Sequence, residues 1–196
     1  MDTYNDFAEL ARNTKEGRDF CVRLQNRPGT TVVIASHGGG IERGTSEIAE
    51  AIAGDDHSFY MFKGIRSHGN KELHITATHF DEPRCMATVN ASPHAIVIHG
   101  ERSSQDIAFL GGRDEAMLNR LHDLLVAEGF NVQTHNDLQG RDEENICNRV
   151  QSKRGVQLEL SKGLRLSFFE ALTKRGCMTK TERFEQFVAV VRQAIL

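Results

Sequence analysis

The sequence predicts an α/β fold, a three-layer αβα sandwich around a mixed, largely parallel central sheet. Two short runs of apolar and β-branched residues, 30–36 and 95–99, are typical of strands that are buried on both faces. Segments with helical spacing of apolar residues follow these strands, an order that places helices on both sides of a parallel sheet. Because 196 residues suffice for one core, we expect a single domain over residues 1–196.

Each predicted helix has a local reason. The helices over 45–53 and 115–128 are each followed directly or within one residue by glycine, which favours a helix end. The C-terminal helix has one apolar face, and Thr179 with Glu182 forms a capping-box pattern at its start. The remaining elements are shorter: helices over 6–16 and 144–151, and strands over 58–63, 72–77, 131–134 and 156–160.

Composition excludes several classes of partner. The formal net charge is −3 and the sequence pI is about 6.3, so no nucleic-acid partner is expected. No apolar run approaches the roughly 20 residues that span a bilayer. The first ten residues lack the basic start and apolar stretch of a signal peptide, so we expect a cytoplasmic protein on synthesis. The four cysteines are widely spaced and are expected to be free thiols, most of them buried.

Candidate metal ligands follow the two most apolar strands. His37 and then Glu42 come after the strand over 30–36, and His99 ends the strand over 95–99. Two imidazoles and one carboxylate leave a fourth zinc position for water, as in catalytic sites, and the intervening glycines let the chain turn tightly. We therefore expect one Zn²⁺ per chain at the carboxyl ends of the strands, where α/β sheets bind ligands. Alternatives are loop histidines without metal, or a glycine-rich phosphate cradle.

A hydrolytic zinc site also needs a general base. Glu159 alternates with Leu158 and Leu160 in the strand over 156–160, so its side chain faces the other side of the sheet from the two leucines. A buried carboxylate is costly unless it has a partner or a role. Glu159 is therefore the predicted catalytic base, the alternative being an exposed edge strand. Glu47 is the rival carboxylate, ranked second because it falls within a predicted helix.

Several motifs carry a resemblance to a known family. Five motifs resemble, in the same order, those of the poly-γ-glutamate hydrolases known from bacteriophages. They are His37-Gly38-Gly39 with Glu42, GTSEIA at 44–49, LHIT at 73–76, FDEP at 80–83 and VIHG at 97–100. The resemblance covers about residues 32–160. It implies a fold similar to zinc carboxypeptidases of the carboxypeptidase A type and a zinc peptidase that cuts γ-glutamyl amide bonds. One departure is that ordinary carboxypeptidases separate the first His and Glu by two residues, whereas four intervene here.

The resemblance also assigns roles and a substrate. It implies that His37, Glu42 and His99 hold the zinc ion and that Glu159 is the general base. An anionic poly-γ-glutamate substrate requires cations, and Arg suits planar recognition of carboxylates. The substrate-binding candidates are Arg113 and Arg84 first, together with His74, and Arg43 and Arg165 also lie in or beside candidate loops. Solvated surface charge is the alternative for each arginine, and His74 could instead complete a strand.

Other functions stay open at this point. The same metal site would serve a carboxypeptidase-like amidase or deacylase on a small N-acyl amino acid or a cell-wall peptide. A metal-free binding module and a phosphate-binding protein are the alternatives from other classes. We expect a monomer, and a phage-encoded enzyme of this kind could leave the cell by lysis.

Overall fold

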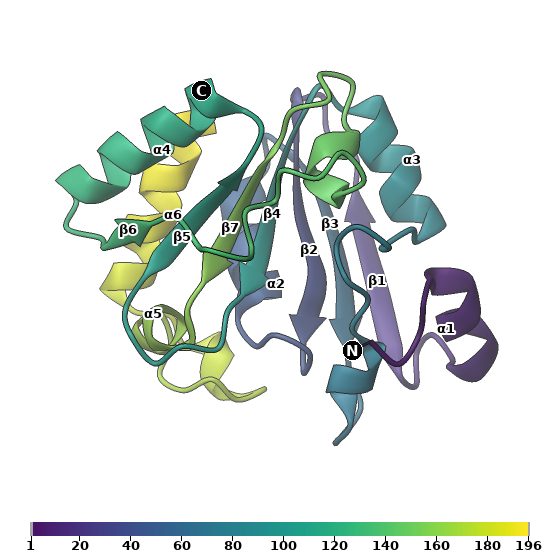
Figure 1. Ribbon diagram of the computed structural model, residues 1–196. Coiled ribbons are helices and arrows are strands. Elements are labelled where there is room, and N and C mark those ends of the chain that lie inside the picture. The colour runs from purple at the N-terminus through teal and green to yellow at the C-terminus, as the bar shows by residue number, and fades with distance from the viewer. Residues whose placement is uncertain (1, 196) are drawn as a thin grey trace.

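One seven-stranded mixed sheet runs through the computed structural model, which describes residues 2–195 (Figure 1). The strand order is β1-β3-β2-β4-β7-β5-β6. The four central strands, β3, β2, β4 and β7, are parallel, whereas β1 and β5 run antiparallel to their inner neighbours. The strands span Phe20–Gln25 (β1), Thr31–Gly39 (β2), Ser58–Gly64 (β3), His94–Gly100 (β4), Ala108–Gly112 (β5), Val132–Gln133 (β6) and Val156–Leu160 (β7). The predicted mixed, largely parallel sheet is confirmed.

Helices cover both faces of the sheet, which gives the three predicted layers (Figure 1). One face packs against α2, α4 and α6. The core on this side includes Phe130, Phe168, Phe184 and Phe187. The other face is covered by α3 and short 3₁₀ turns over a second apolar cluster. The helices span Phe7–Asn13 (α1), Thr45–Ala53 (α2), Pro83–Ala91 (α3), Glu115–Ala127 (α4), Lys162–Ser167 (α5) and Glu182–Ile195 (α6), and the 3₁₀ turns span Asn70–Leu73 (η1), Ile146–Arg149 (η2) and Gly176–Met178 (η3).

The predicted strand over 72–77 is wrong. Leu73 and Ile75 are buried and alternate with more exposed neighbours, which imitates a strand, but η1 occupies the first part of this segment. Its backbone groups bond to side chains rather than to another strand: the Thr76 N–H donates to the carboxylate of Asp2, and the Ile75 carbonyl contacts a ring nitrogen of His37. The apolar alternation therefore reports burial against the sheet, not membership of it.

Four further elements were not predicted from the sequence, namely β1, β5, α3 and α5. The hydroxyl of Thr181, rather than Thr179, accepts a hydrogen bond from the backbone N–H of Phe184 at the start of α6. All four cysteines are free thiols, as predicted, and Cys85, Cys147 and Cys177 are buried. Within residues 2–195, no helix combines the length and the apolar character needed to cross a bilayer.

Candidate metal centre and active site

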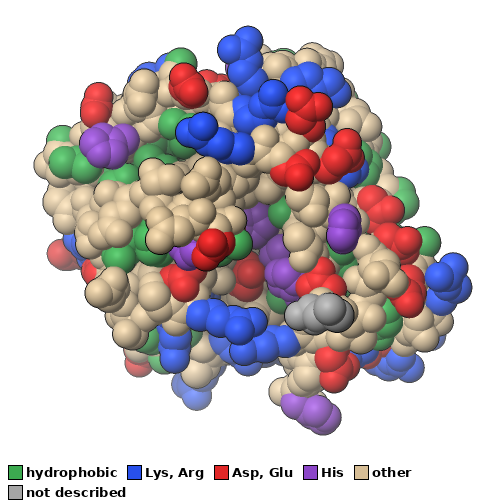
Figure 2. All heavy atoms as spheres, in the orientation of Figure 1, with side chains coloured by type: hydrophobic (Ala, Val, Ile, Leu, Met, Phe, Trp, Pro, Cys, Tyr) green, Lys and Arg blue, Asp and Glu red, His purple; other side chains and the backbone are tan. Residues whose placement is uncertain are grey.

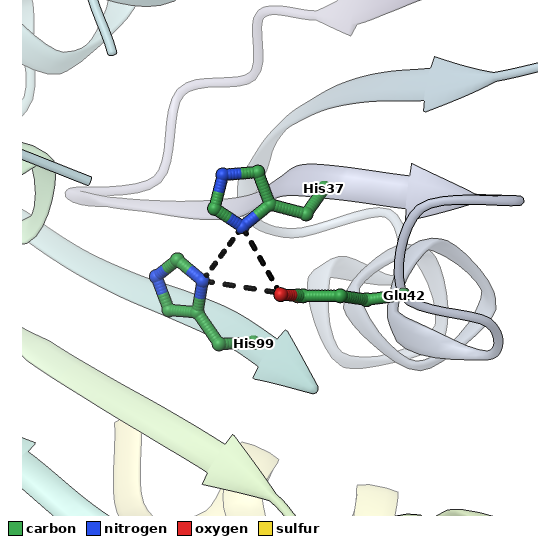
Figure 3. Close-up of side chains that lie close together, drawn as sticks. All are labelled: His37, Glu42 and His99. Carbon is green, nitrogen blue, oxygen red and sulfur yellow. Dashed lines mark hydrogen bonds and ion pairs between the residues drawn. The ribbon is translucent and has the colours of Figure 1, made fainter. Parts of the chain in front are cut away.

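Three adjacent parallel strands bring the candidate residues to one edge of the sheet. β2 supplies His37, β4 supplies His99, and β7 supplies Glu159, which lies directly beside His99 in the register of the two strands. The pairing of β2 with β3 shifts between Ala35 and Gly38, so the ladder is irregular where His37 leaves it. Such irregularities re-aim side chains near the ends of strands, and here the imidazole of His37 points toward that of His99 (Figure 3).

His37, Glu42 and His99 form a compact, buried group (Figure 3). The two Nδ1 atoms lie 3.1 Å apart, and Glu42 Oε1 lies 3.4 Å from His37 Nδ1. Glu42 Oε2 lies 3.9 Å from His99 Nδ1. The sequence separates these side chains by as many as 62 positions, and the sheet topology brings them together.

The turn between His37 and Glu42 depends on glycine. Gly39 has a φ of +65°, and a Cβ atom there would lie 2.5 Å from the backbone carbonyl oxygen of Gly64. The Glu42 N–H closes the turn by donating to the His37 carbonyl at 2.8 Å. The Gly100 N–H donates to Glu42 Oε2 at 2.8 Å, so the carboxylate is fixed from β4 as well. A side chain at position 39 would force this turn apart.

Neighbouring groups orient the ring of His37. Its Nε2–H donates to the Ile75 carbonyl at 2.8 Å, which leaves Nδ1 as the nitrogen that faces Glu42 and His99. His74 stacks on this ring with 4.1 Å between centroids, and His74 Nδ1–H donates to Asp2 at 2.7 Å. In contrast, His99 Nε2 is buried without a hydrogen-bond partner among residues 2–195.

The protonation states suit a cation. Burial, followed by the charge of His37, lowers the pKa of His99 to about 3, so its ring is neutral. Burial alone would raise the pKa of Glu42, but His37 and His99 outweigh it and lower that pKa to about 2. Burial likewise opposes protonation of His37, but Glu42 raises its pKa. The Glu42 carboxylate therefore favours positive charge at the position between the three side chains.

These three side chains fit Zn²⁺. Tetrahedral zinc with ligand distances of about 2.0–2.1 Å requires ligand atoms about 3.3 Å apart. The two Nδ1 atoms are 3.1 Å apart, and the Glu42 carboxylate approaches His37 to 3.4 Å through Oε1 and His99 to 3.9 Å through Oε2, so small shifts of this carboxylate would bring one oxygen into place. The donor set is two imidazole nitrogens and one carboxylate, all lying within 4.8 Å of one another. Two nitrogen lone pairs pointing at each other repel unless a proton or a metal lies between them, so a cation has a reason to bind here.

Glu159 lies in the interior of the sheet, since β7 has β4 on one side and β5 on the other. Its side chain is only 8% exposed. Burial, followed by the charges of Glu42 and Glu101, raises the pKa of Glu159 well above its ordinary value. Gln157 Nε2 donates to Glu159 Oε1 over a long 3.4 Å, and Asn145 Nδ2 donates to Gln157 Oε1 at 2.9 Å. Among residues 2–195, Glu159 forms no ion pair, and it lies beside His99 of the triad formed by His37, Glu42 and His99.

The burial of Glu159 predicts a pH-dependent stability. Between the pKa of Glu in the unfolded chain, about 4.3, and the raised pKa of Glu159 in the fold, the folded state holds the extra proton, so stability falls as pH rises. We expect zinc-free Glu159→Gln to unfold at a higher temperature than the zinc-free wild type at about pH 8. The difference should shrink toward about pH 4. Thermal unfolding in chelator at both pH values measures it, and a pH-independent difference would contradict the buried charge.

A cavity of about 750 Å³ opens over the triad and Glu159. The loop of residues 136–142 lines it, together with His74 and Thr76. Gln157 forms part of its floor. The triad, the buried carboxylate and His74 therefore face one common space that a substrate could enter.

The two arginines favoured from the sequence do not reach this cavity. Because β5 runs antiparallel to β7, Arg113 after β5 lies beside the start of β7, away from Glu159, and its Nη1 pairs with Glu143 at 3.0 Å. Arg84 on α3 pairs with Glu16 and Glu82 and does not line this cavity. His74 does line the cavity. Arg113 was predicted as a substrate-binding residue because it follows Gly111-Gly112 in a candidate loop, and the structure places that loop at the end of β5 away from Glu159.

Glu47, the rival base, points elsewhere: it pairs with Lys63 at 2.7 Å and does not line the cavity. Sequence reasoning missed Gln157 and Asp2. A signal for Gln157 existed, because it precedes Glu159 by two positions in an otherwise apolar strand and so shares its face. No sequence signal could place Asp2 against His74, since 72 positions separate them.

An α/β sheet with a cavity over convergent histidines and carboxylates at the carboxyl ends of its strands defines an enzyme-type site. The sequence model of poly-gamma-glutamate hydrolase matches residues 4–190, and the chain belongs to this family. It is 35% identical over 194 residues to UPF0714 protein YndL of Bacillus subtilis (strain 168), covering 97% of this chain and 76% of YndL. Membership of this family supports hydrolase activity as the general class of function.

Two solved structures are very similar to this one. A bacteriophage poly-gamma-glutamate hydrolase matches with a TM-score of 0.96 at 28% identity, over 99% of this chain and 96% of that chain. A zinc-free apo form of YndL matches with a TM-score of 0.94 at 34% identity, over 99% and 97% of the two chains. The similarity therefore extends over the whole described fold, including the three strands that carry the triad and Glu159.

Proposed function

We propose that this protein is a zinc-dependent hydrolase that cleaves γ-glutamyl amide bonds of poly-γ-glutamate. The observation that carries the proposal is the buried His37–Glu42–His99 group facing the same cavity as the unpaired carboxylate of Glu159. Membership of the poly-gamma-glutamate hydrolase family supports the substrate. The relative YndL has been solved as a zinc-free apo form, which supports zinc as the metal.

The residues divide into ligands and a base. His37 Nδ1, His99 Nδ1 and a Glu42 carboxylate oxygen would hold Zn²⁺. When bound, zinc supplies Lewis acidity, which polarises an amide carbonyl and makes a water molecule more acidic. The Glu159 carboxylate takes the proton from the attacking water and delivers it to the nitrogen of the leaving amine, which completes hydrolysis without a net change at Glu159. Gln157 holds the Glu159 carboxylate in place through its amide N–H.

The raised pKa of Glu159 suits this double role. A base with an ordinary glutamate pKa would take a proton from water poorly, and burial raises the pKa of Glu159, which makes its carboxylate a stronger base. The pKa of Glu42 is shifted in the opposite direction to that of Glu159. Because the pKa of Glu42 is lowered, its carboxylate stays ionised, as a metal ligand must. Two carboxylates on one edge of the sheet thus take different tasks because their surroundings differ.

The direct test is incubation of the purified protein with poly-γ-glutamate, with and without a chelator, followed by sizing of the products. We expect the polymer to be shortened, chelation to stop the reaction, and added Zn²⁺ to restore it. Circular dichroism of the chelated protein should be unchanged, because both apolar clusters lie outside the triad. Shortening that continues at full rate in chelator would refute the metal, and a polymer left intact under all conditions would refute the substrate.

A further inference from the structure

A second hollow, of about 860 Å³, adjoins the catalytic cavity. The two share Glu42, His74, Thr76, Gly100 and Arg102 in their walls, so one continuous depression leads from the triad into the second hollow. Figure 2 shows this face: Lys and Arg side chains gather directly below the His and acidic side chains of the central depression. The charge of the second hollow is what distinguishes it from the first.

Five cationic side chains line this second hollow, which we call the basic hollow: Arg43, Lys71, Arg102, Lys162 and Arg165. Among residues 2–195, none of the five has a carboxylate within 4.0 Å, whereas Arg84 and Arg113 are ion-paired. Cations without an ion pair also occur elsewhere, Arg12 and Lys15 among them, but the five line one hollow. The two acidic residues in its wall are already engaged, Asp2 with His74 and Glu42 within the triad. A chain with a net charge of −3 therefore concentrates unpaired positive charge beside its active site.

Arg165 is the buried end of this cationic group. It is 6% exposed, and its guanidinium donates to the backbone carbonyls of Leu160, Arg43 and Glu101. Three of its five N–H groups are thus used, which leaves one on each terminal nitrogen. The guanidinium packs against Gly100, where a Cβ atom would lie 2.8 Å from its Cζ. A buried guanidinium without a carboxylate is costly, and an anionic ligand in the hollow would offset that cost.

The part of the catalytic cavity that is not shared with the basic hollow has a different character. The loop of residues 136–142, Asn-Asp-Leu-Gln-Gly-Arg-Asp, carries two acidic residues and one basic residue, and Glu101 and Glu159 lie near it in the same cavity. A γ-glutamyl polymer carries one carboxylate per glutamate. It is therefore attracted to the basic hollow and not to this acidic part of the catalytic cavity. The asymmetry indicates where along the substrate most of the charge contacts are made.

We propose that the basic hollow binds several consecutive carboxylates of an extended γ-glutamyl polymer on one side of the bond that is cleaved. This rests on the proposed function, since it takes the triad as the point of cleavage. Arg165 binds a carboxylate close to the triad through the two remaining N–H groups of its terminal nitrogens, and such a pair of donors suits a planar anion. Arg43, Lys71, Arg102 and Lys162 hold the carboxylates that follow, through exposed attractions that salt weakens.

The test compares two triple variants with the same change of charge. Arg43→Gln/Lys71→Gln/Lys162→Gln removes three cations of the basic hollow and leaves buried Arg165 in place. The matched control, Arg12→Gln/Lys15→Gln/Arg154→Gln, removes three exposed cations that line neither hollow and form no ion pair with any of residues 2–195. Binding of fluorescently labelled poly-γ-glutamate is followed by anisotropy in chelator, where no cleavage is expected. Circular dichroism checks that both variants are folded.

We expect the basic-hollow variant to bind the polymer at least about tenfold more weakly than the wild type, which corresponds to about 1.4 kcal/mol, and to lose most of the salt dependence. The control should stay within about twofold of the wild type. Equal weakening in both variants would overturn the proposal in favour of general charge steering, and wild-type affinity in the basic-hollow variant would overturn it outright. Because binding is read without cleavage, failure of the proposed reaction appears separately, as an intact polymer in the sizing assay.

Discussion

Glu159→Gln is expected to lower turnover on poly-γ-glutamate by about 10²–10⁴, the usual contribution of a general base. The amide keeps the size of the side chain and can still accept a hydrogen bond from Gln157, but it cannot take a proton from water. Zinc content and folding should remain close to those of the wild type, since Glu159 is not one of the three clustered ligand residues. Steady-state kinetics and metal analysis on the same preparation measure both effects.

The matched control is Glu47→Gln. Glu47 is the rival carboxylate in the sequence, and its pairing with Lys63 outside the cavity predicts nearly unchanged turnover. If Glu47→Gln loses turnover while Glu159→Gln retains it, the assignment of the base is reversed. If Glu159→Gln loses zinc together with turnover, Glu159 is a ligand rather than a base.

His99→Ala is expected to weaken zinc binding by more than about 100-fold, because loss of an outer-shell partner alone costs about 10–100-fold and His99 is proposed as a direct ligand. Glu42→Gln should lose zinc as well, since the neutral amide supplies no negative charge to the ion. Activity should fall with zinc content in both variants. Competition with a chromogenic chelator gives the affinities, and metal analysis gives the occupancy, which should be about one ion per wild-type chain.

His122→Ala serves as the control for this series, because His122 is exposed on α4, pairs with its neighbour Asp123 and does not line the cavity over the triad. It should keep wild-type zinc content. Full occupancy in His99→Ala would show that the ion is held elsewhere, and the proposed site would then be wrong. Loss of zinc in His122→Ala together with His99→Ala would indicate global instability, which the unfolding temperatures of the two variants would separate from loss of a ligand.

The sequence by itself determined the central strands and the residues that emerge from them. The apolar run before His37 and the apolar run ending at His99 are short and rich in β-branched residues, which is typical of strands buried on both faces. Residues directly after such strands must share one edge, so the proximity of His37 and His99 followed from the pattern alone. The helix Thr45–Ala53 and the strand Val156–Leu160 were predicted with the bounds that the structure shows.

Only the tertiary structure decided the directions of the outer strands and the partners of the charged residues. A short strand such as β5 carries no local mark of its direction, because the pairing energy is shared with a neighbour that is distant in sequence. Its antiparallel course removes Arg113 from the site, while the fold brings Arg165 there instead. Residue types and local periodicity thus specify the ligands, whereas long-range pairing specifies which cations face the substrate.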